Sequence, residues 1–457
     1  MNRPSHLRTD RDSRPRRGHG LAVLAAARTP FAKAFTEFRD HSAVTLGAAV
    51  TRDVLRRADL DGNAVDEVVF GNVAGPPDAA NIGRVIALTA GIPQDRPAHT
   101  VNRNCGSGLE TLIAAGHILA EGRADVVLAG GTESMSNIPL LFRPSAAAAW
   151  SRLARSKTWA AKLAALAAFR PQHFRPLVGI ELGLTDPTCG LNMGQTAEVL
   201  ADEFGITREE QDRYAAESHR RASETQRRCF LSGEIIAIDA QGDPVRRDSP
   251  DERQAPITAG QDNAIRHAPS MEQLAKLRPI FRPGGSVTAG NSCGISDGAA
   301  AAILVRPADV SRFDSPPLGY ITGYAVAGCD PKRMGLGPVY ATAKLLRQSG
   351  RTLEDFDRIE LNEAFAAQVL ACGRAAESAA FARRELGADR PLGKLVDERT
   401  NVHGGAIAIG HPVGATGLRL VLTLLRALRE SGQRRGLVTL CVGGGQGMAI
   451  TVETEQE

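Results

Sequence analysis

The chain contains two copies of one pattern, 309 residues apart. In the first copy, an apolar helical stretch from Gly108 to Glu121 is followed by a β-branched strand that ends in Gly130-Gly131. In the second, a similar stretch from Gly417 to Glu430 precedes a strand that ends before Gly443-Gly444. Apolar helices alternating with short buried strands are typical of parallel α/β folds. The pattern therefore predicts a duplicated α/β domain with mainly parallel, buried sheets.

A second pair of segments supports the duplication, because residues 65–72 resemble residues 356–362 and each pair member follows a helical stretch. Different material lies between the copies, where Thr207 with Glu210 and Ser270 with Gln273 have the spacing of helix capping boxes. A strand at Ser286–Ala289 is expected to return the chain to the first sheet. The predicted domains are an N-terminal domain (21–142 and 286–310), an inserted helical and loop domain (143–285), and a C-terminal domain (318–454).

The net charge of +4 has a local origin, because residues 1–20 hold six Arg and two Asp and the remainder is neutral overall. Aromatic residues make up only 4% of the chain, so base-stacking surfaces and a nucleic-acid partner are not expected. The tail, 1–20, has almost no apolar residues and is predicted to be disordered. Arg16-Arg17 before Leu21–Ala27 superficially resembles a twin-arginine signal, but the apolar run is short and a buried first strand is favoured.

Seven cysteines occur at 105, 189, 229, 293, 329, 372 and 441, and no Cys-x-x-Cys is present. An odd number with this spacing fits neither a disulfide framework nor a zinc site, so no metal is expected. A reducing cytoplasm is the expected location, because it would keep reactive thiols usable.

Residues 143–175 carry seven Lys or Arg and no acid. Trp159, Leu163 and Leu166 within them are spaced for one helix face. Two interpretations stay open: a solvated basic helix packed on its own domain, or a helix that docks on a membrane surface or a partner.

Two residues could carry nucleophilic chemistry. Cys105 lies just before an apolar helix, where the helix macrodipole and free amides would stabilise a thiolate. His411, held in a turn by Gly410 and Pro412, is the candidate base for removing the thiol proton. Taken alone, a cysteine such as Cys105 is more often a small core residue, and a loop histidine such as His411 is more often structural.

Two further residues end strands, where active sites of α/β sheets are found. Cys441 precedes three glycines, so its thiol could shuttle a proton while Gly443 offers a backbone N–H to an oxyanion. A phosphate loop is the alternative, but no Lys-Ser/Thr pair follows. Asn362 could hold a water or a carbonyl oxygen, and Glu363 beside it is expected to tie down the loop.

As a set, these segments resemble the motifs of the thiolase family, and the likeness runs from about Leu21 to Glu453. The matching motifs are Asn104-Cys105-Gly106-Ser107-Gly108, Gly130-Gly131-Thr132-Glu133-Ser134-Met135-Ser136, Asn362-Glu363-Ala364-Phe365-Ala366, Gly404–Ala408 with Gly410-His411-Pro412-Val413-Gly414-Ala415-Thr416-Gly417, and Cys441-Val442-Gly443-Gly444-Gly445-Gln446-Gly447. The resemblance implies a thiolase-like fold of duplicated α/β domains, with helices between and around mixed sheets, plus an inserted helical and loop domain.

The resemblance also implies the reaction 3-ketoacyl-CoA + CoA ⇌ acyl-CoA + acetyl-CoA, without a cofactor, because CoA and acyl-CoA are substrates. By carry-over, Cys105 is the acylated nucleophile, His411 activates it, and Cys441 is the acid/base at the acetyl carbon. Asn362, through a water, would join His411 at the thioester oxyanion, and the amides of Cys105 and Gly443 would form a second oxyanion site. The implied CoA contacts are Met193, Arg266, Ser292, Cys293, Ala364 and Phe365.

The sequence departs from the family pattern at Asn192, Cys293 and His403, where His, Ser and Asn are frequent. These departures concern acyl-chain preference and CoA contacts rather than the reacting groups. A homodimer or homotetramer is implied by the family. The basic insert resembles that of β-subunits of fatty-acid oxidation complexes, which implies an α-subunit or a membrane surface as partner and a role in β-oxidation. Alternatives are an acetoacetyl-CoA thiolase of biosynthesis, a decarboxylating ketosynthase, and an inactive thiolase-like lipid carrier or scaffold.

Overall fold

The computed structural model describes residues 20–245, 257–267 and 269–455. The strands of its main sheet are β1 (Leu21–Arg28), β2 (Ala32–Lys33), β3 (Glu67–Gly71), β4 (Ala98–Val101), β5 (Val126–Ser134), β10 (Ser296–Val305), β11 (Gly319–Gly328), β12 (Arg358–Leu361), β13 (Arg435–Val442) and β14 (Gln446–Glu453). The helices of the two repeats are α1 (Ala43–Arg57), α2 (Ile82–Thr89), α3 (Ser107–Ala120), α10 (Gly337–Ser349), α11 (Ala366–Glu377), α12 (Ala379–Phe381), α13 (Ala406–Ile409) and α14 (Val413–Glu430).

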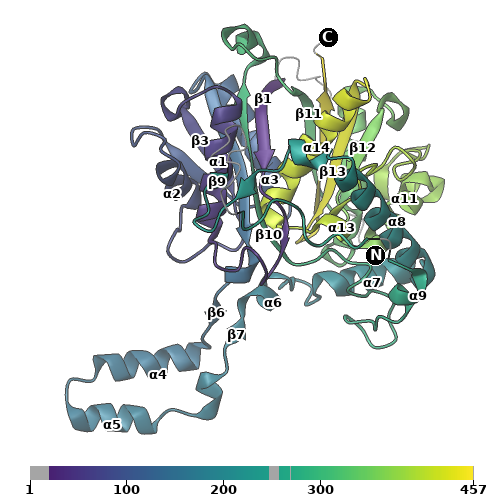
Figure 1. The fold of residues 1–457 in the computed structure, drawn as a ribbon. Helices are drawn as coiled ribbons and strands as arrows, with labels where there is room; N and C mark the ends of the chain where they lie inside the picture. Colours follow the sequence, from purple (N-terminus) through teal and green to yellow (C-terminus); the bar gives the residue numbers. More distant parts are fainter. Residues whose placement is uncertain (1–19, 246–256, 268, 456–457) are drawn as a thin grey trace.

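A single mixed sheet joins both repeats (Figure 1). Its order is β12-β13-β14-β11-β1-β10-β5-β3-β4, with β2 paired to β10, and the halves meet where β1 runs antiparallel to β11. The α/β class is confirmed, but the expectation of mainly parallel pairing is wrong. Among the described strands of the main sheet, only β3 with β4 and β5, and β12 with β13, are parallel. The long strands β10, β11 and β14 return antiparallel, and β13 reaches β14 through the tight glycine turn 443–445, which needs no crossover helix.

The sheet is buried on both faces, which explains the almost continuous apolar run of β1. Leu21 and Val23 pack into a core with α3 and α14, whereas Ala22 and Leu24 pack on the other face with α1. Alternate side chains of a strand point to opposite faces, so a strand covered twice must be apolar throughout.

The repeated helices α3 and α14 lie against each other at the centre of the molecule (Figure 1). Their equivalent glycines make the contact. A Cβ at Gly108 would lie 2.9 Å from the Leu418 nitrogen, and a Cβ at Gly417 would lie 2.5 Å from the Leu109 nitrogen. Only glycine permits this approach of the two backbones, so the duplication predicted from the sequence is expressed as a symmetric helix contact.

The material between the repeats contains β6 (Leu140–Leu141), α4 (Pro144–Arg155), α5 (Trp159–Ala167), β7 (Leu177–Val178), α6 (Gly179–Gly183), α7 (Met193–Glu203), α8 (Arg208–Arg227), β8 (Ala237–Ile238), β9 (Pro244–Val245) and α9 (Met271–Ala275). The capping boxes predicted for α8 and α9 are present. A return strand at Ser286–Ala289 is wrong: the chain there makes only an isolated bridge from Thr288 to Pro279 and does not pair with the main sheet, which it joins at β10, from Ser296. Its four-residue β-like pattern is too short to mark a strand without its neighbours.

The basic segment forms a projecting hairpin rather than a helix packed on its own domain. Helices α4 and α5 pack on each other and extend away from the body on the two-stranded β6–β7 stem (Figure 1). The interpretation of a basic helix packed on its domain is therefore wrong, because the β6–β7 stem carries both helices clear of the main sheet.

Within the described residues, no helix is both long and apolar enough to cross a bilayer. The same residues contain no group of three or more His, Cys, Asp or Glu that could hold a metal ion. All seven cysteines are free thiols. The predicted disordered tail, 1–20, lies outside the described residues except for Gly20. The predicted domain boundaries remain predictions.

Candidate active site

Cys105 sits in a tight turn at the start of α3. Asn104 before it has a φ of 45°, and its side-chain Nδ2 donates to the Gly443 carbonyl at 2.8 Å. The N–H of Gly443 in turn hydrogen-bonds to the Cys105 sulfur. The glycine turn between β13 and β14, in which Gly444 and Gly445 have φ of 86° and 77°, therefore holds the turn that carries Cys105.

Burial governs the protonation of Cys105. Desolvation raises the pKa of the thiol, and the hydrogen bonds from Gly443 and from the Cys105 amide lower it less. The negative charge of Glu133 raises the pKa further. The amides favour thiolate, as expected from the sequence, but the expectation of a net stabilised thiolate is wrong because desolvation outweighs them. Cys105 therefore rests as a thiol and needs a base.

Three sulfur atoms converge at this place. Cys441 ends β13 and is 1% exposed. Desolvation raises its pKa well above the usual value, and the charges of Cys105, Cys372 and Cys293 raise it as well. Desolvation also raises the pKa of Cys293 to about 12, with a second contribution from the charge of Cys105. Because charges interact in this way only over short distances, the mutual interactions of Cys105, Cys441 and Cys293 indicate that these three thiols lie close together, whereas Cys372 acts on Cys441 alone of the three.

His411 follows α13 and is held as a neutral base. Its Nδ1 lies 2.7 Å from the Thr416 hydroxyl, which donates its one proton to the Pro412 carbonyl at 3.0 Å. The Thr416 oxygen must therefore accept from Nδ1–H, which leaves Nε2 unprotonated. Nε2 is buried without a hydrogen-bond partner, and desolvation lowers the pKa of His411 to about 3, with a smaller contribution from Arg419. An imidazole in this state can accept a proton.

Gly410 explains why the chain turns as it does before His411. Its φ is 107°, and a Cβ there would lie 2.3 Å from the Ser296 hydroxyl. That hydroxyl accepts from the His411 backbone N–H at 3.3 Å. The left-handed turn and the close approach to β10 both require glycine.

Asn362, directly after β12, presents an unpaired amide. Its backbone N–H donates to Thr439 at 3.0 Å, which continues the pairing with β13. The side chain is 0% exposed, and neither Oδ1 nor Nδ2 has a hydrogen-bond partner. Buried polar groups are almost always paired, so an amide free at both ends indicates a position for a water or a substrate oxygen.

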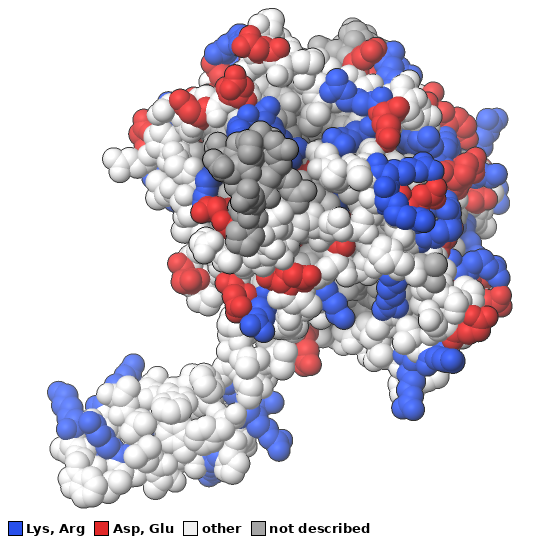
Figure 2. Space-filling model, in the orientation of Figure 1, with Lys and Arg blue, Asp and Glu red and all other residues white. Residues whose placement is uncertain are grey.

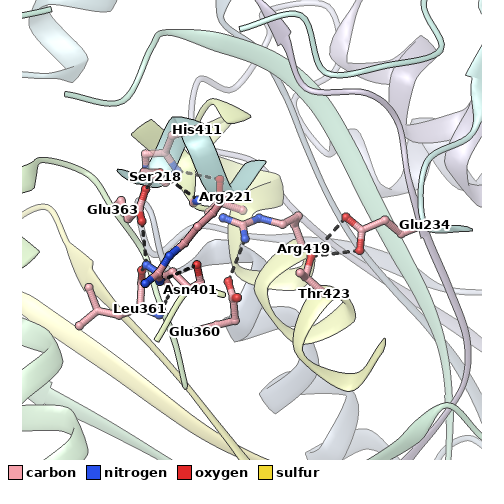
Figure 3. A network of polar contacts seen from close by, with 12 residues as sticks. Ser218, Arg221, Glu234, Glu360, Leu361, Glu363, Asn401, His411, Arg419 and Thr423 are labelled. Atoms are coloured by element: carbon pink, nitrogen blue, oxygen red, sulfur yellow. Dashed lines mark hydrogen bonds and ion pairs between the residues drawn. The ribbon is translucent and has the colours of Figure 1, made fainter. Parts of the chain in front are cut away.

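Glu363 ties its loop to three other segments (Figure 3), in agreement with the expectation that it ties down the loop. Its Oε1 accepts from the Tyr214 hydroxyl at 2.9 Å and from Asn401 Nδ2 at 3.0 Å. Its Oε2 accepts from the Ser218 hydroxyl at 2.6 Å and from the Ile407 N–H at 3.3 Å. The carboxyl group of Glu363 thus holds α8 and α13 next to the end of β12, where Asn362 lies.

Glu133 was not identified as a site residue from the sequence. It is fully buried in β5 and accepts four hydrogen bonds, from Asn72 Nδ2 and from the backbone N–H groups of Val73, Ala74 and Gly414, at 3.0 to 3.1 Å. Burial raises its pKa to about 7. It joins the start of α14 to β5 beside Cys105. An acid flanked by Gly, Thr and Ser within a buried strand is the signal that could have revealed it.

Four of the predicted CoA contacts lie together. Ser292 and Phe365 form an isolated antiparallel bridge, and the Cys293 N–H donates to the Ala364 carbonyl at 3.0 Å. Because Cys293 also interacts with Cys105, this pair of segments borders the sulfur site.

The other two predicted CoA contacts, Met193 and Arg266, lie in different surroundings. Met193 begins α7, and its Sδ would lie 3.5 Å from a Cβ at Gly443, so it borders the glycine turn. Arg266 is exposed and its backbone N–H donates to His219 Nδ1 at 3.1 Å. The described contacts of Arg266 do not reach the cysteines.

Comparison with known proteins gives one consistent result. The thiolase N-terminal domain matches residues 21–308 and the thiolase C-terminal domain matches residues 315–454. An acetyl-CoA acetyltransferase from Chromobacterium violaceum is 37% identical, over 95% of this chain and 99% of that protein. A probable acetyl-CoA acyltransferase from Staphylococcus aureus is 38% identical, over 94% and 98%.

Solved structures agree. Human mitochondrial 3-ketoacyl-CoA thiolase in complex with CoA is similar with a TM-score of 0.79 and 34% identity, covering 95% of this chain and 98% of that one. The acetyl-CoA acetyltransferase from Syntrophomonas wolfei has a TM-score of 0.81 and 31% identity, covering 96% and 100%. The chain belongs to the thiolase family and is an acyltransferase.

Proposed function

We propose that the protein transfers an acyl group between CoA and acetyl-CoA through a thioester on Cys105: 3-ketoacyl-CoA + CoA ⇌ acyl-CoA + acetyl-CoA. The observation that carries this proposal is the closeness of the Cys105, Cys441 and Cys293 thiols. A neutral His411, whose buried Nε2 has no hydrogen-bond partner, is the candidate base. Cleavage of a carbon–carbon bond needs a covalent acyl trap and a separate proton donor, and two thiols with different surroundings meet that need.

In the first half-reaction, His411 Nε2 removes the Cys105 proton and the sulfur attacks the 3-keto carbon. The C2–C3 bond then breaks, its electron pair stays on C2, and Cys441 donates a proton to that carbon to release acetyl-CoA. In the second half-reaction, the thiol of a fresh CoA loses its proton and attacks the Cys105 thioester, which releases acyl-CoA and returns Cys105 as a leaving thiolate. The CoA thiol proton passes to the Cys441 thiolate, and His411 returns the proton that it took in the first half-reaction to the leaving Cys105 thiolate.

Two sets of donors suit the oxyanions of this sequence. The free amide of Asn362, through a water, and His411 are assigned to the thioester oxygen of the departing enolate. The N–H groups of Cys105 and Gly443 are assigned to the oxygen of the attacked carbonyl. The Gly443 N–H supports this role because it already faces the Cys105 sulfur. Such preorganised donors act strongly in a site that excludes water.

For the substrate, we propose 3-ketoacyl-CoA degradation as in β-oxidation. The similarity to a human mitochondrial 3-ketoacyl-CoA thiolase supports it. A short-chain acetoacetyl-CoA thiolase of biosynthesis is the second candidate, favoured by relatives named acetyl-CoA acetyltransferase. Rates of thiolysis measured with acetoacetyl-CoA and with longer 3-ketoacyl-CoA separate the two. Strong preference for acetoacetyl-CoA would reject the first candidate.

An inactive lipid carrier is the alternative of another class. Mass spectrometry after exposure to acyl-CoA distinguishes it, because the enzyme should carry an acyl adduct on Cys105 and a carrier should carry none. The Cys105→Ala variant is the control and should neither form the adduct nor turn over. Full turnover by that variant would refute the assignment of the nucleophile.

For assembly, we propose a homodimer or homotetramer. Strand β4 supports it, because it ends the main sheet and all four of its residues are half-buried, which leaves an edge available for pairing. Light scattering should give a mass of two or four chains of 48.4 kDa each, and a monomer at all concentrations would contradict it. A reducing cytoplasm is the proposed location, since the described cysteines are free thiols.

A further inference from the structure

The hairpin of residues 138–178 presents large apolar side chains to solvent. Trp159, Leu163 and Leu166, on one face of α5, are 75%, 47% and 51% exposed. The small residues Ala146 and Ala165 fill the interior between α4 and α5 instead. Because a protein in water gains by burying its largest apolar groups first, this inverted arrangement marks a surface that is buried against something else.

The apolar surface continues to the base of the hairpin. Phe142 and Phe174, beside the β6–β7 stem, are 55% and 59% exposed. Trp150, on α4, contacts both the Phe142 ring and the Phe169 ring, with centroids 6.5 Å and 4.9 Å apart. Phe142, Trp150, Phe169 and Phe174 therefore form one connected cluster at the base of the hairpin.

The charge of the hairpin has one sign. Between Glu133 and Glu181 there is no acid, and the seven basic residues are all exposed: Arg143, Arg152, Arg155, Lys157, Lys162, Arg170 and Arg175. In the described part of the chain none of the seven forms an ion pair. Figure 2 shows the hairpin as white and blue without red, whereas both signs mix on the visible face of the body. Seven unpaired cations beside exposed aromatics call for an anionic, apolar partner.

We propose that this hairpin docks on an anionic lipid surface. Its apolar side chains enter the boundary between headgroups and acyl chains, and its Lys and Arg contact the phosphates. Helices of 12 and 9 residues, α4 and α5, are too short to span a bilayer and suit a position in its interface. Tryptophan prefers this interface because its ring is apolar and its N–H is polar.

The geometry favours a lipid surface over a protein partner. The hairpin stands away from the body, so a flat surface can reach it without contact with the rest of the chain (Figure 1). Its positive charges lie on α4, on α5 and on both connections to the stem, so they are spread over the hairpin rather than gathered at one point. A lipid surface, which adapts its headgroups, can neutralise charges so dispersed.

Tryptophan fluorescence can measure binding of the hairpin to vesicles without an added label. It contains two tryptophans, Trp150 and Trp159, and both lie in the hairpin. Tryptophan fluorescence, excited at a wavelength that tyrosine does not absorb, therefore reports on this element alone. Adding phosphatidylcholine vesicles that contain phosphatidylglycerol should shift the emission to shorter wavelength, and brominated lipids should quench it. Pure phosphatidylcholine vesicles should produce a much smaller shift, and added salt should weaken binding.

Paired variants separate the contribution of the basic side chains to binding from that of the apolar side chains. Lys157→Gln with Lys162→Gln should weaken binding to the anionic vesicles on the order of thirtyfold, since one such charge contributes about fivefold. The matched control is Arg383→Gln with Arg390→Gln, at two exposed arginines of the body. Leu163→Ser with Leu166→Ser should weaken binding about tenfold or more, whereas Leu88→Ser, at an exposed leucine of α2, should not.

Several outcomes would overturn the proposal. The emission could remain unchanged with anionic vesicles, the body control could weaken binding as much as the hairpin variant, or a protein or a nucleic acid could bind the hairpin while vesicles do not. Thiolysis measured in the same samples keeps this test separate from the proposed function, because the hairpin variants should retain the rate of the unaltered enzyme.

Discussion

Replacing Glu363 tests whether the site is held by one buried carboxyl group. The side chain is 1% exposed and accepts four hydrogen bonds, from Tyr214, Asn401, Ser218 and the Ile407 N–H. Glu363→Gln keeps the shape but turns one acceptor oxygen into an NH₂ donor. If that NH₂ faces Ser218, the serine hydroxyl can turn and accept, but the Ile407 N–H then meets a donor and is left unpaired.

The expected cost follows from the number of donors left without a partner. One buried unsatisfied N–H costs about 1–3 kcal/mol, so Glu363→Gln should lower the free energy of unfolding by about that amount. In the opposite amide orientation the Tyr214 hydroxyl can turn and accept, but Asn401 Nδ2 faces the NH₂ and loses this acceptor, so the expected cost is similar. Glu363→Ala removes all four acceptor contacts and leaves a cavity, so a loss of about 3–6 kcal/mol is expected.

Urea unfolding followed by circular dichroism measures these differences at constant pH. The control is Glu377→Gln, at an exposed glutamate of α11, which should change the free energy of unfolding by less than about 0.5 kcal/mol. If Glu363→Gln is as stable as this control, the carboxyl group does not hold α8 and α13 in place and the reasoning fails.

Three further changes examine the reacting groups and the pH response. Cys441→Ala should still form the acyl adduct on Cys105, seen by mass spectrometry, but thiolysis should fall on the order of hundredfold or more, because the acetyl carbon loses its proton donor; undiminished thiolysis would show that another group supplies the proton. Asn362→Ala should lower kcat on the order of hundredfold by removing one oxyanion donor, and an unchanged kcat in steady-state assays would mean that the buried amide serves only the fold. Burial, with Arg358, Arg228 and Arg426, lowers the pKa of His403 from 6.5 to about 4. Because its pKa is lower in the folded state, His403 takes up a proton in the unfolded chain first. The free energy of unfolding is therefore highest above pH 6.5 and falls as the pH drops toward 4. The His403→Asn variant should therefore lose about 3 kcal/mol less stability than the unaltered chain between pH 6.5 and 4, measured by urea unfolding; equal losses would contradict the assignment.

Local patterns predicted local structure well. The apolar stretch from Gly108 to Glu121 is α3, and the capping box of Thr207 with Glu210 begins α8. These predictions depend on residues a few positions apart, where helix periodicity and side-chain capping act directly. The prediction of a strand at Ser286–Ala289 was wrong because a strand must pair with another strand. Whether a partner is available depends on distant parts of the chain.

The site shows the same division. The motifs indicated Cys105, His411, Cys441 and Asn362, but not their electrostatic state. The thiolate expected at Cys105 is opposed by desolvation, and desolvation depends on everything that surrounds the turn. Glu133 was overlooked because its four hydrogen-bond donors belong to residues that are 59 to 281 positions away in the sequence.

By itself the sequence determined the family, the repeated helix and strand units, and the types of side chain available for acyl transfer, because each is written in short stretches of the chain. Only the tertiary structure decided that both repeats share one mixed sheet, that Gly108 meets the backbone of α14, and that the hairpin stands free of the body. Pairing, close approach and desolvation are properties of groups brought together across hundreds of residues, and a linear pattern carries no measure of the distance between them.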